Sequence, residues 1–249
     1  MLPFVYVGST PHCVIINKKG RLWMEILNLG SHRIGVRFPE KGLRKGKNPA
    51  ILLNDGELIE QLNLRTEQAV LVGVFPNNRL SEYTPWPEPA IRPGTPDFGG
   101  QLGQYLRELN NEILPALIDE YALDTEKLAY GGYSLGGLAA TMSLWETDAF
   151  AAVFSLCGSF WYPGVADFIE EHVPKNHSTQ VYLQNGIREA KATTTACVMP
   201  IAMPNESTLP CKRHVEPKLC WMTTAIMTGK VSVLTLHCVG WNVCYESLA

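Results

Sequence analysis

The sequence is short of charged residues, and neither sign dominates. Only 18% of its 249 residues are Asp, Glu, Lys or Arg, against roughly 25% in an average globular chain. The 21 basic and 24 acidic residues leave a formal net charge of -3. Proteins that bind nucleic acid present a basic surface to the phosphates. The charge balance therefore argues against nucleic acid as a partner.

Long hydrophobic runs are also absent. No apolar stretch approaches the roughly 20 residues that a transmembrane helix requires. The first residues, Met1-Leu2-Pro3-Phe4, place no basic segment ahead of their short apolar run, so they do not resemble a secretory signal. We expect a cytoplasmic protein without a membrane partner. The sequence does not indicate an oligomeric state.

The seven cysteines follow no metal-binding or disulfide pattern. Their number is odd, and they form neither a Cys-x-x-Cys pair nor a cluster with histidines, the spacings typical of zinc sites. We therefore expect no metal, no structural disulfides and no organic cofactor.

Apolar residues, at 46% of the chain, suffice for a large core. The length is near the upper limit for one core, so residues 1–249 are expected to form a single domain. Residues 49–53 and 69–75 are short, nearly continuous apolar runs, which are typical of strands buried on both faces of a parallel sheet. Further strands are expected at 127–131, 150–157, 180–183 and 231–236.

Helical spacing of apolar residues alternates with these strands. It covers residues 101–121, where Pro115 predicts a kink or a local break, and a second helix is expected at 136–145. Residues 58–67 predict a short helix, and the proline-rich stretch 76–100 reads as a long loop. Residues 1–48 are rich in strand-like segments. Strands alternating with helices indicate an α/β fold with a mostly parallel central sheet and helices on both faces.

One motif indicates a catalytic site. Gly132-Tyr133-Ser134-Leu135-Gly136 fits the G-x-S-x-G nucleophile elbow, in which a serine occupies a strained turn between a strand and a helix. A predicted buried strand precedes it, and small residues open the helix that follows. The alternative is an ordinary turn. We take Ser134 as the candidate nucleophile.

A serine nucleophile needs a histidine base and a carboxylate that orients it, and in this motif they follow in the order serine, acid, histidine. Glu189 comes after the predicted strand 180–183 as a triad acid should; alternatively it is a surface glutamate. His214 and His237 are the histidines in the required order. We prefer His237, because it directly follows the predicted strand 231–236. A histidine without a catalytic role is the alternative.

An oxyanion hole requires two backbone N–H groups, one from the residue after the nucleophile and one from a loop after an earlier strand. Leu135 supplies the first. The turn after the predicted strand 49–53 supplies the second, from Glu57 or Gly56. The alternative is a simple tight turn.

These features together resemble the "putative esterase" family of α/β-hydrolases, which includes enterochelin (siderophore) esterases, S-formylglutathione hydrolases and mycolyltransferases. The resemblance covers residues 49–191. It is carried by the segments Leu52-Leu53-Asn54-Asp55-Gly56, Asn78 to Trp86, Asp97 to Gly100, Asp124 to Gly137 and Gly158-Ser159-Phe160-Trp161. It implies a serine esterase acting on small-molecule carboxylic esters. It also implies that Arg79 and Trp161 line the substrate pocket, with an ion pair and core packing as their respective alternatives.

The tail departs from the family. Only seven of residues 193–249 are charged, although five of the seven cysteines lie there. Family members normally end in a histidine-bearing loop and a charged amphipathic helix, and neither is recognisable here. An abrupt change of composition is typical of a reading-frame change. The alternative function is therefore a catalytically impaired or silent esterase-like binding protein whose catalytic histidine is lost in the tail.

Overall fold

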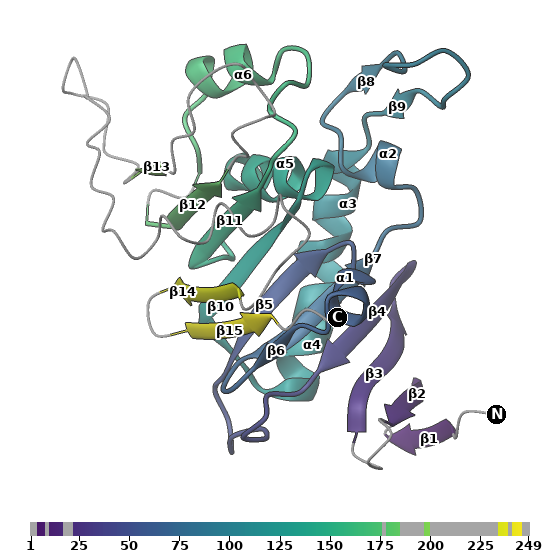
Figure 1. Ribbon diagram of the computed structural model, residues 1–249, viewed down its shortest axis with the longest axis vertical. Helices are drawn as coiled ribbons and strands as arrows, with labels where there is room; N and C mark the ends of the chain where they lie inside the picture. Colours follow the sequence, from purple (N-terminus) through teal and green to yellow (C-terminus); the bar gives the residue numbers. More distant parts are fainter. Residues whose placement is uncertain are drawn as a thin grey trace.

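The computed structural model describes the backbone of residues 4–7, 10–16, 22–175, 178–184, 197–199, 234–238 and 241–245, and the side chains within 24–175 and 178–184. Ten strands form one sheet in the order β1-β2-β3-β4-β7-β5-β10-β11-β12-β13. Figure 1 shows it running from β1 at the lower right to β12 at the upper left. Strands β7, β5, β10, β11 and β12 are parallel to one another, as the apolar runs predicted.

The strands of this sheet are β1 (Phe4–Val7), β2 (Thr10–Ile16), β3 (Leu22–Leu29), β4 (His32–Arg37), β5 (Asn48–Asn54), β7 (Val70–Phe75), β10 (Leu123–Tyr133), β11 (Ala152–Leu156), β12 (Gln180–Gln184) and β13 (Cys197–Met199). Two small sheets join β6 (Arg65–Thr66) to β14 (Leu234–Cys238) and β15 (Trp241–Tyr245), and β8 (Pro87–Glu88) to β9 (Phe98–Gly99). The strand-rich start is confirmed, since β1 to β4 form an antiparallel edge.

The helices are α1 (Leu58–Gln61), α2 (Arg79–Glu82), α3 (Leu102–Glu108), η1 (Leu109–Ile113), α4 (Leu114–Tyr121), α5 (Leu135–Met142), η2 (Ser143–Trp145) and α6 (Val165–Glu171). Both faces of the sheet are buried. In β5, Leu52 joins one apolar cluster, which includes Leu106 and Leu138, while Ile51 and Leu53 on either side of it join the other. This alternation explains why the strand reads as a continuous apolar run.

Two local predictions were wrong. The helix expected over 58–67 ends at Gln61, because Asn63 takes a left-handed conformation with φ 46° and the next residues form β6. The stretch 76–100 is not a featureless loop: it holds α2, β8 and β9. Helix α2 begins where the Asn78 side chain caps it by accepting a hydrogen bond from the Ser81 N–H.

The helix predicted over 101–121 is interrupted as Pro115 suggested. The turn η1 is π-helical, and Pro115 lies in the first turn of the following helix α4. Proline is tolerated there because its missing N–H is not needed at a helix start. Helices α3, η1 and α4 follow one another without a gap, so the interruption is a local change of hydrogen-bonding pattern within one helical segment.

Candidate active site

Ser134 lies between the end of β10 and the start of α5, and its backbone is strained. Its φ of 57° and ψ of -119° fall in a region that residues other than glycine rarely occupy. Such a conformation costs about 1–3 kcal/mol and persists only where the surroundings enforce it. Strand, strained serine and helix together are the geometry of a nucleophile elbow.

The glycines around Ser134 are required by close approach. A Cβ atom on Gly132 would lie 2.6 Å from the carbonyl carbon of Gly136, and one on Gly137 would lie 2.5 Å from the Ser155 hydroxyl oxygen. Real Cβ atoms essentially never come so close. The helix can therefore pack against the strand only because these positions lack side chains.

Hydrogen bonds fix both the backbone and the hydroxyl of Ser134. Its N–H donates to the Leu156 carbonyl, and its carbonyl accepts from the N–H groups of Leu138 and Ser159. The hydroxyl oxygens of Ser134 and Ser159 lie 3.2 Å apart, and Ser159 is buried. Because Ser134 itself is half-buried, its hydroxyl is held in place without being sealed from solvent.

The predicted oxyanion donors differ in whether their N–H groups already have an acceptor. Leu135 opens α5, where the first N–H groups have no partner inside the helix. Glu57 is the N-cap residue of α1, and within the described chain no acceptor contacts its N–H. The alternative donor Gly56 is a wrong choice, because its N–H donates to the Val74 carbonyl at 2.9 Å. Leu135 and Glu57 stay the predicted pair.

Arg79 is held by an ion pair, the alternative considered for it. Its Nε and Nη2 donate to the two carboxylate oxygens of Asp55 at 2.7 and 2.9 Å, and Nη2 also donates to the Tyr133 carbonyl at 3.1 Å. Burial alone would lower the pKa of Arg79, but the bond to Asp55 outweighs it and the pKa is raised. Arg79 is therefore charged and paired, as the ion-pair alternative predicted, and its place in a substrate pocket stays a prediction.

Trp161 is not a core residue. Its side chain is 55% exposed, although its ring contacts those of Phe98 and Tyr162. Tyr133, directly before the predicted nucleophile, is 45% exposed. The exposure of the Trp161 indole excludes the alternative that this residue only fills the core. The role of Trp161 in a substrate pocket stays a prediction.

The predicted acid and base are not brought to Ser134 by the described structure. Glu189 lies outside the described residues, as does His214. The backbone of His237 lies inside β14, not after a strand, and β14 pairs through β15 with β6. Since β6 precedes the amino end of β7, and Ser134 follows the carboxyl end of a strand parallel to β7, the two backbones lie toward opposite ends of the sheet.

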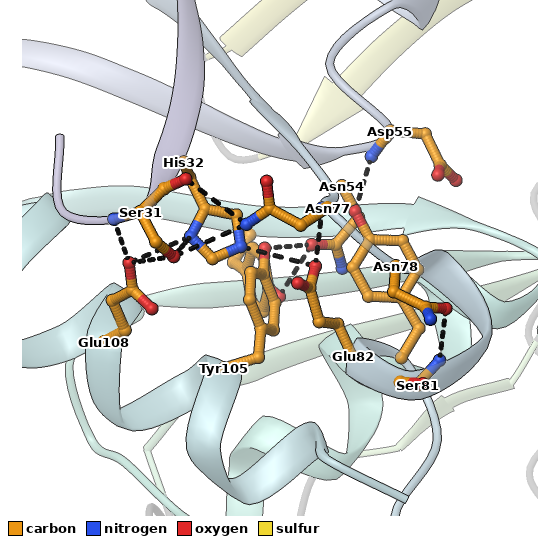
Figure 2. Close-up of polar contacts among 12 residues, drawn as sticks. Ser31, His32, Asn54, Asp55, Asn77, Asn78, Ser81, Glu82, Tyr105 and Glu108 are labelled. Carbon is orange, nitrogen blue, oxygen red and sulfur yellow. Dashed lines mark hydrogen bonds and ion pairs between the residues drawn. The ribbon is translucent and has the colours of Figure 1, made fainter. Parts of the chain in front are cut away.

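A buried polar network behind the elbow escaped the sequence prediction. Its centre is Asn54, which is fully buried and whose side-chain oxygen accepts hydrogen bonds from the hydroxyls of Tyr105 at 2.7 Å and Tyr130 at 2.9 Å. Its amide group donates to the Gly136 carbonyl at 2.8 Å. An asparagine ending an otherwise apolar strand was the available signal. Figure 2 shows Asn54 beside Tyr105.

A buried histidine extends this network. The ring nitrogens of His32 lie 3.0 Å from Glu108 and 3.3 Å from Glu82, and its ring contacts that of Tyr105 at 5.4 Å between centroids; Figure 2 shows this arrangement. Burial lowers the pKa of His32, but the hydrogen bonds to Glu82 and Glu108 outweigh it and raise the pKa. His32, Glu82 and Glu108 come from separate segments, so no spacing pattern in the sequence indicates that they meet.

The charged form of His32 should stabilise the fold at low pH. Because the pKa of His32 is raised on folding, its contribution is complete below the unfolded pKa of about 6.5 and is lost as pH rises through the folded pKa. We expect His32→Gln to lower the free energy of unfolding by about 1 kcal/mol more at pH 6 than at pH 9. Urea unfolding of both proteins at the two pH values measures this, and a pH-independent difference would contradict it.

The described residues contain neither a membrane-spanning helix nor a metal-binding cluster. No helix there combines the length and apolar character needed to traverse a bilayer. Over the same ranges, no group of three or more His, Cys, Asp or Glu side chains is arranged to hold a metal ion.

A sheet with five parallel central strands, covered on both faces, and a strained serine between strand and helix define the α/β-hydrolase class. The family model described as "Putative esterase" matches residues 30–208. The chain therefore belongs to this esterase family, as its motifs suggested. The uncharacterized protein YbbA of Bacillus subtilis is 30% identical over 183 residues, which cover 66% of this chain and 73% of that protein.

Solved structures share the fold at low sequence identity. An IroE-like serine hydrolase from Shewanella oneidensis is 20% identical with a TM-score of 0.53, over 70% of this chain and 60% of that one. An enterochelin esterase from Shigella flexneri is 16% identical with a TM-score of 0.51, over 71% of this chain and 48% of that one. These likenesses support the α/β-hydrolase fold.

Proposed function

We propose that the protein is a serine esterase that cleaves small-molecule carboxylic esters through an acyl-enzyme at Ser134. The observation that carries this proposal is the strained backbone of Ser134, at φ 57° and ψ -119° between β10 and α5. A conformation of this cost is expected where the chain must present a side chain for function. Membership of the esterase family supports the same conclusion.

The proposed reaction has two steps. The Ser134 hydroxyl oxygen attacks the ester carbonyl carbon while a histidine takes the hydroxyl proton, and the oxyanion that forms accepts hydrogen bonds from the N–H groups of Leu135 and Glu57. When this tetrahedral intermediate collapses, the bond to the alcohol breaks. The alcohol leaves with the proton that the histidine had taken from Ser134. Water then attacks the acyl group by the same route and restores Ser134.

Sequence order still favours His237 as the base and Glu189 as the carboxylate that orients it. This assignment requires the chain around His237 to lie beside Ser134, and not at the end of the sheet where β14 places it. His214 is the competing base. The ester itself is proposed only as a class. Because one protein of similar fold is an enterochelin esterase, siderophore esters belong among the first substrates to test, beside short acyl esters.

One observation favours a second candidate, a silent esterase-like binding protein. The His237 backbone lies in β14, toward the end of the sheet opposite to Ser134. Among the residues whose side chains are described, no histidine contacts the Ser134 hydroxyl; its partner there is Ser159. A site with an elbow and oxyanion donors but no base would bind esters without cleaving them.

Fluorophosphonate labelling separates the two candidates, because the reagent reacts with serines that a base has activated. We expect one label on the folded wild-type protein, found at Ser134 by peptide mass spectrometry. Ser134→Ala should remain unlabelled, while Ser31→Ala, which changes an exposed serine, should label like the wild type. Circular dichroism checks that each protein is folded.

The same assay identifies the base. His237→Ala is expected to lose labelling and His214→Ala to keep it. The reverse pattern would transfer the role of base to His214. A folded wild-type protein that takes no label would overturn the esterase proposal and support the binding protein.

A further inference from the structure

Arg79 connects two segments of the site that are distant in sequence. It opens α2, and its guanidinium reaches the carboxylate of Asp55, after β5, and the carbonyl of Tyr133, the last residue of β10. Neither contact follows from a local motif. One side chain therefore ties the turn after β5 to the residue that immediately precedes the proposed nucleophile.

The geometry of this connection is specific to arginine. Two nitrogens meet the two oxygens of Asp55, and one of the two also reaches the Tyr133 carbonyl. The planar guanidinium offers several donors in a fixed arrangement, whereas a lysine ammonium is a point charge on a flexible stem. A lysine at position 79 would keep the charge but could not hold both acceptors in the same way.

The Asp55 carboxylate is built into the elbow. Its side chain is only 7% exposed, against 34% for Arg79. A Cβ atom on Gly136 would lie 3.1 Å from an Asp55 carboxylate oxygen, so the carboxylate packs against the second glycine of the elbow. The Asp55 backbone is fixed as well, because its N–H donates to the Tyr83 hydroxyl at 2.9 Å.

The turn that holds Asp55 also supplies the proposed oxyanion donor Glu57, two residues later. The nucleophile Ser134 and the other donor, Leu135, belong to the elbow. Hydrolysis needs the oxygen of the nucleophile and both donors at fixed positions around one carbonyl group. The Arg79 bridge therefore connects the turn that bears Glu57 to the elbow that bears Ser134, and it lies where their relative position is determined.

We propose that Arg79, held by Asp55, is a positioning residue that fixes the elbow carbonyl of Tyr133 relative to the turn bearing Glu57. The inference rests on the proposed esterase function of Ser134. It differs from substrate binding by Arg79, since the bridge acts on the geometry of the site and not on the charge of the ester.

Steady-state hydrolysis of p-nitrophenyl butyrate, a neutral ester, tests this role. We expect Arg79→Ala and Arg79→Lys both to lower kcat by about 100-fold, the effect of a misplacement of about 1 Å, with KM nearly unchanged. Arg44→Ala is the matched control, because Arg44 is exposed and donates to Gln68; its kcat should equal that of the wild type.

Chemical rescue adds a readout that general destabilisation would not give. Millimolar methylguanidinium should restore part of the kcat of Arg79→Ala, while methylammonium should not. Activity of Arg79→Lys equal to the wild type, or a change confined to KM, would overturn the proposal. A wild-type protein that neither hydrolyses the ester nor takes the fluorophosphonate label would instead overturn the esterase function on which it rests.

Discussion

Replacing Ser134 with alanine is expected to slow ester hydrolysis by about four to six orders of magnitude. This is the usual loss when the nucleophile of a triad is removed, because only binding and the oxyanion hole then assist the reaction. KM should change little, since the hydroxyl contributes little to ground-state binding of the ester. Initial rates with p-nitrophenyl butyrate, measured for wild type and Ser134→Ala, give both constants.

Ser31→Ala serves as the control for this measurement, as it removes a hydroxyl that bonds to Glu108 and not to the elbow. It should retain the wild-type rate. A Ser134→Ala protein that keeps more than about a tenth of the wild-type rate would show that hydrolysis does not pass through this residue. Loss of a nucleophile lowers the rate by far more than tenfold.

Replacing Asn54 with leucine is expected to lower the free energy of unfolding by about 3 kcal/mol or more. Leucine has a similar shape, but it leaves the hydroxyls of Tyr105 and Tyr130 without their acceptor and the Gly136 carbonyl without its donor. Both tyrosines are buried, and each unsatisfied buried group costs about 1–3 kcal/mol. Urea unfolding followed by circular dichroism measures the loss.

The matched control removes the partners as well. In Asn54→Leu combined with Tyr105→Phe and Tyr130→Phe, the two hydroxyls are gone, so much of the lost stability should return. Replacing both members of a buried hydrogen bond by apolar groups is often nearly neutral. A loss below about 1 kcal/mol for Asn54→Leu, or a triple variant less stable than the single one, would contradict this account of the network.

The sheet and its main helices could be predicted because their signals are local. Apolar runs such as 69–75 indicate strands that are buried on both faces of the sheet. The glycines of the elbow indicate close packing of strand against helix. Element ends were less predictable, since they depend on distant partners. Strand β6 exists because Thr66 pairs with Val243, and no pattern near Thr66 contains that information.

The candidate site was predictable only where one segment defines it. Ser134 and Leu135 belong to a single motif, and the turn around Glu57 follows a recognisable strand. The bridge from Arg79 to Asp55 and Tyr133 joins three segments, so sequence reasoning left open whether Arg79 was an ion-pair or a pocket residue. Gly56 was a poor choice of donor because its acceptor, Val74, lies on the neighbouring strand.

The π-helical turn η1 acts as a phase correction for the helix around it. From Leu109 the buried residues Ile113, Leu117 and Tyr121 recur every four positions, whereas an α-helix has 3.6 residues per turn. Over three such steps the buried stripe of a regular α-helix would rotate by about 120° away from the sheet. A wider turn takes up part of this rotation, and it lets Tyr121 still face Glu25, to which its hydroxyl donates.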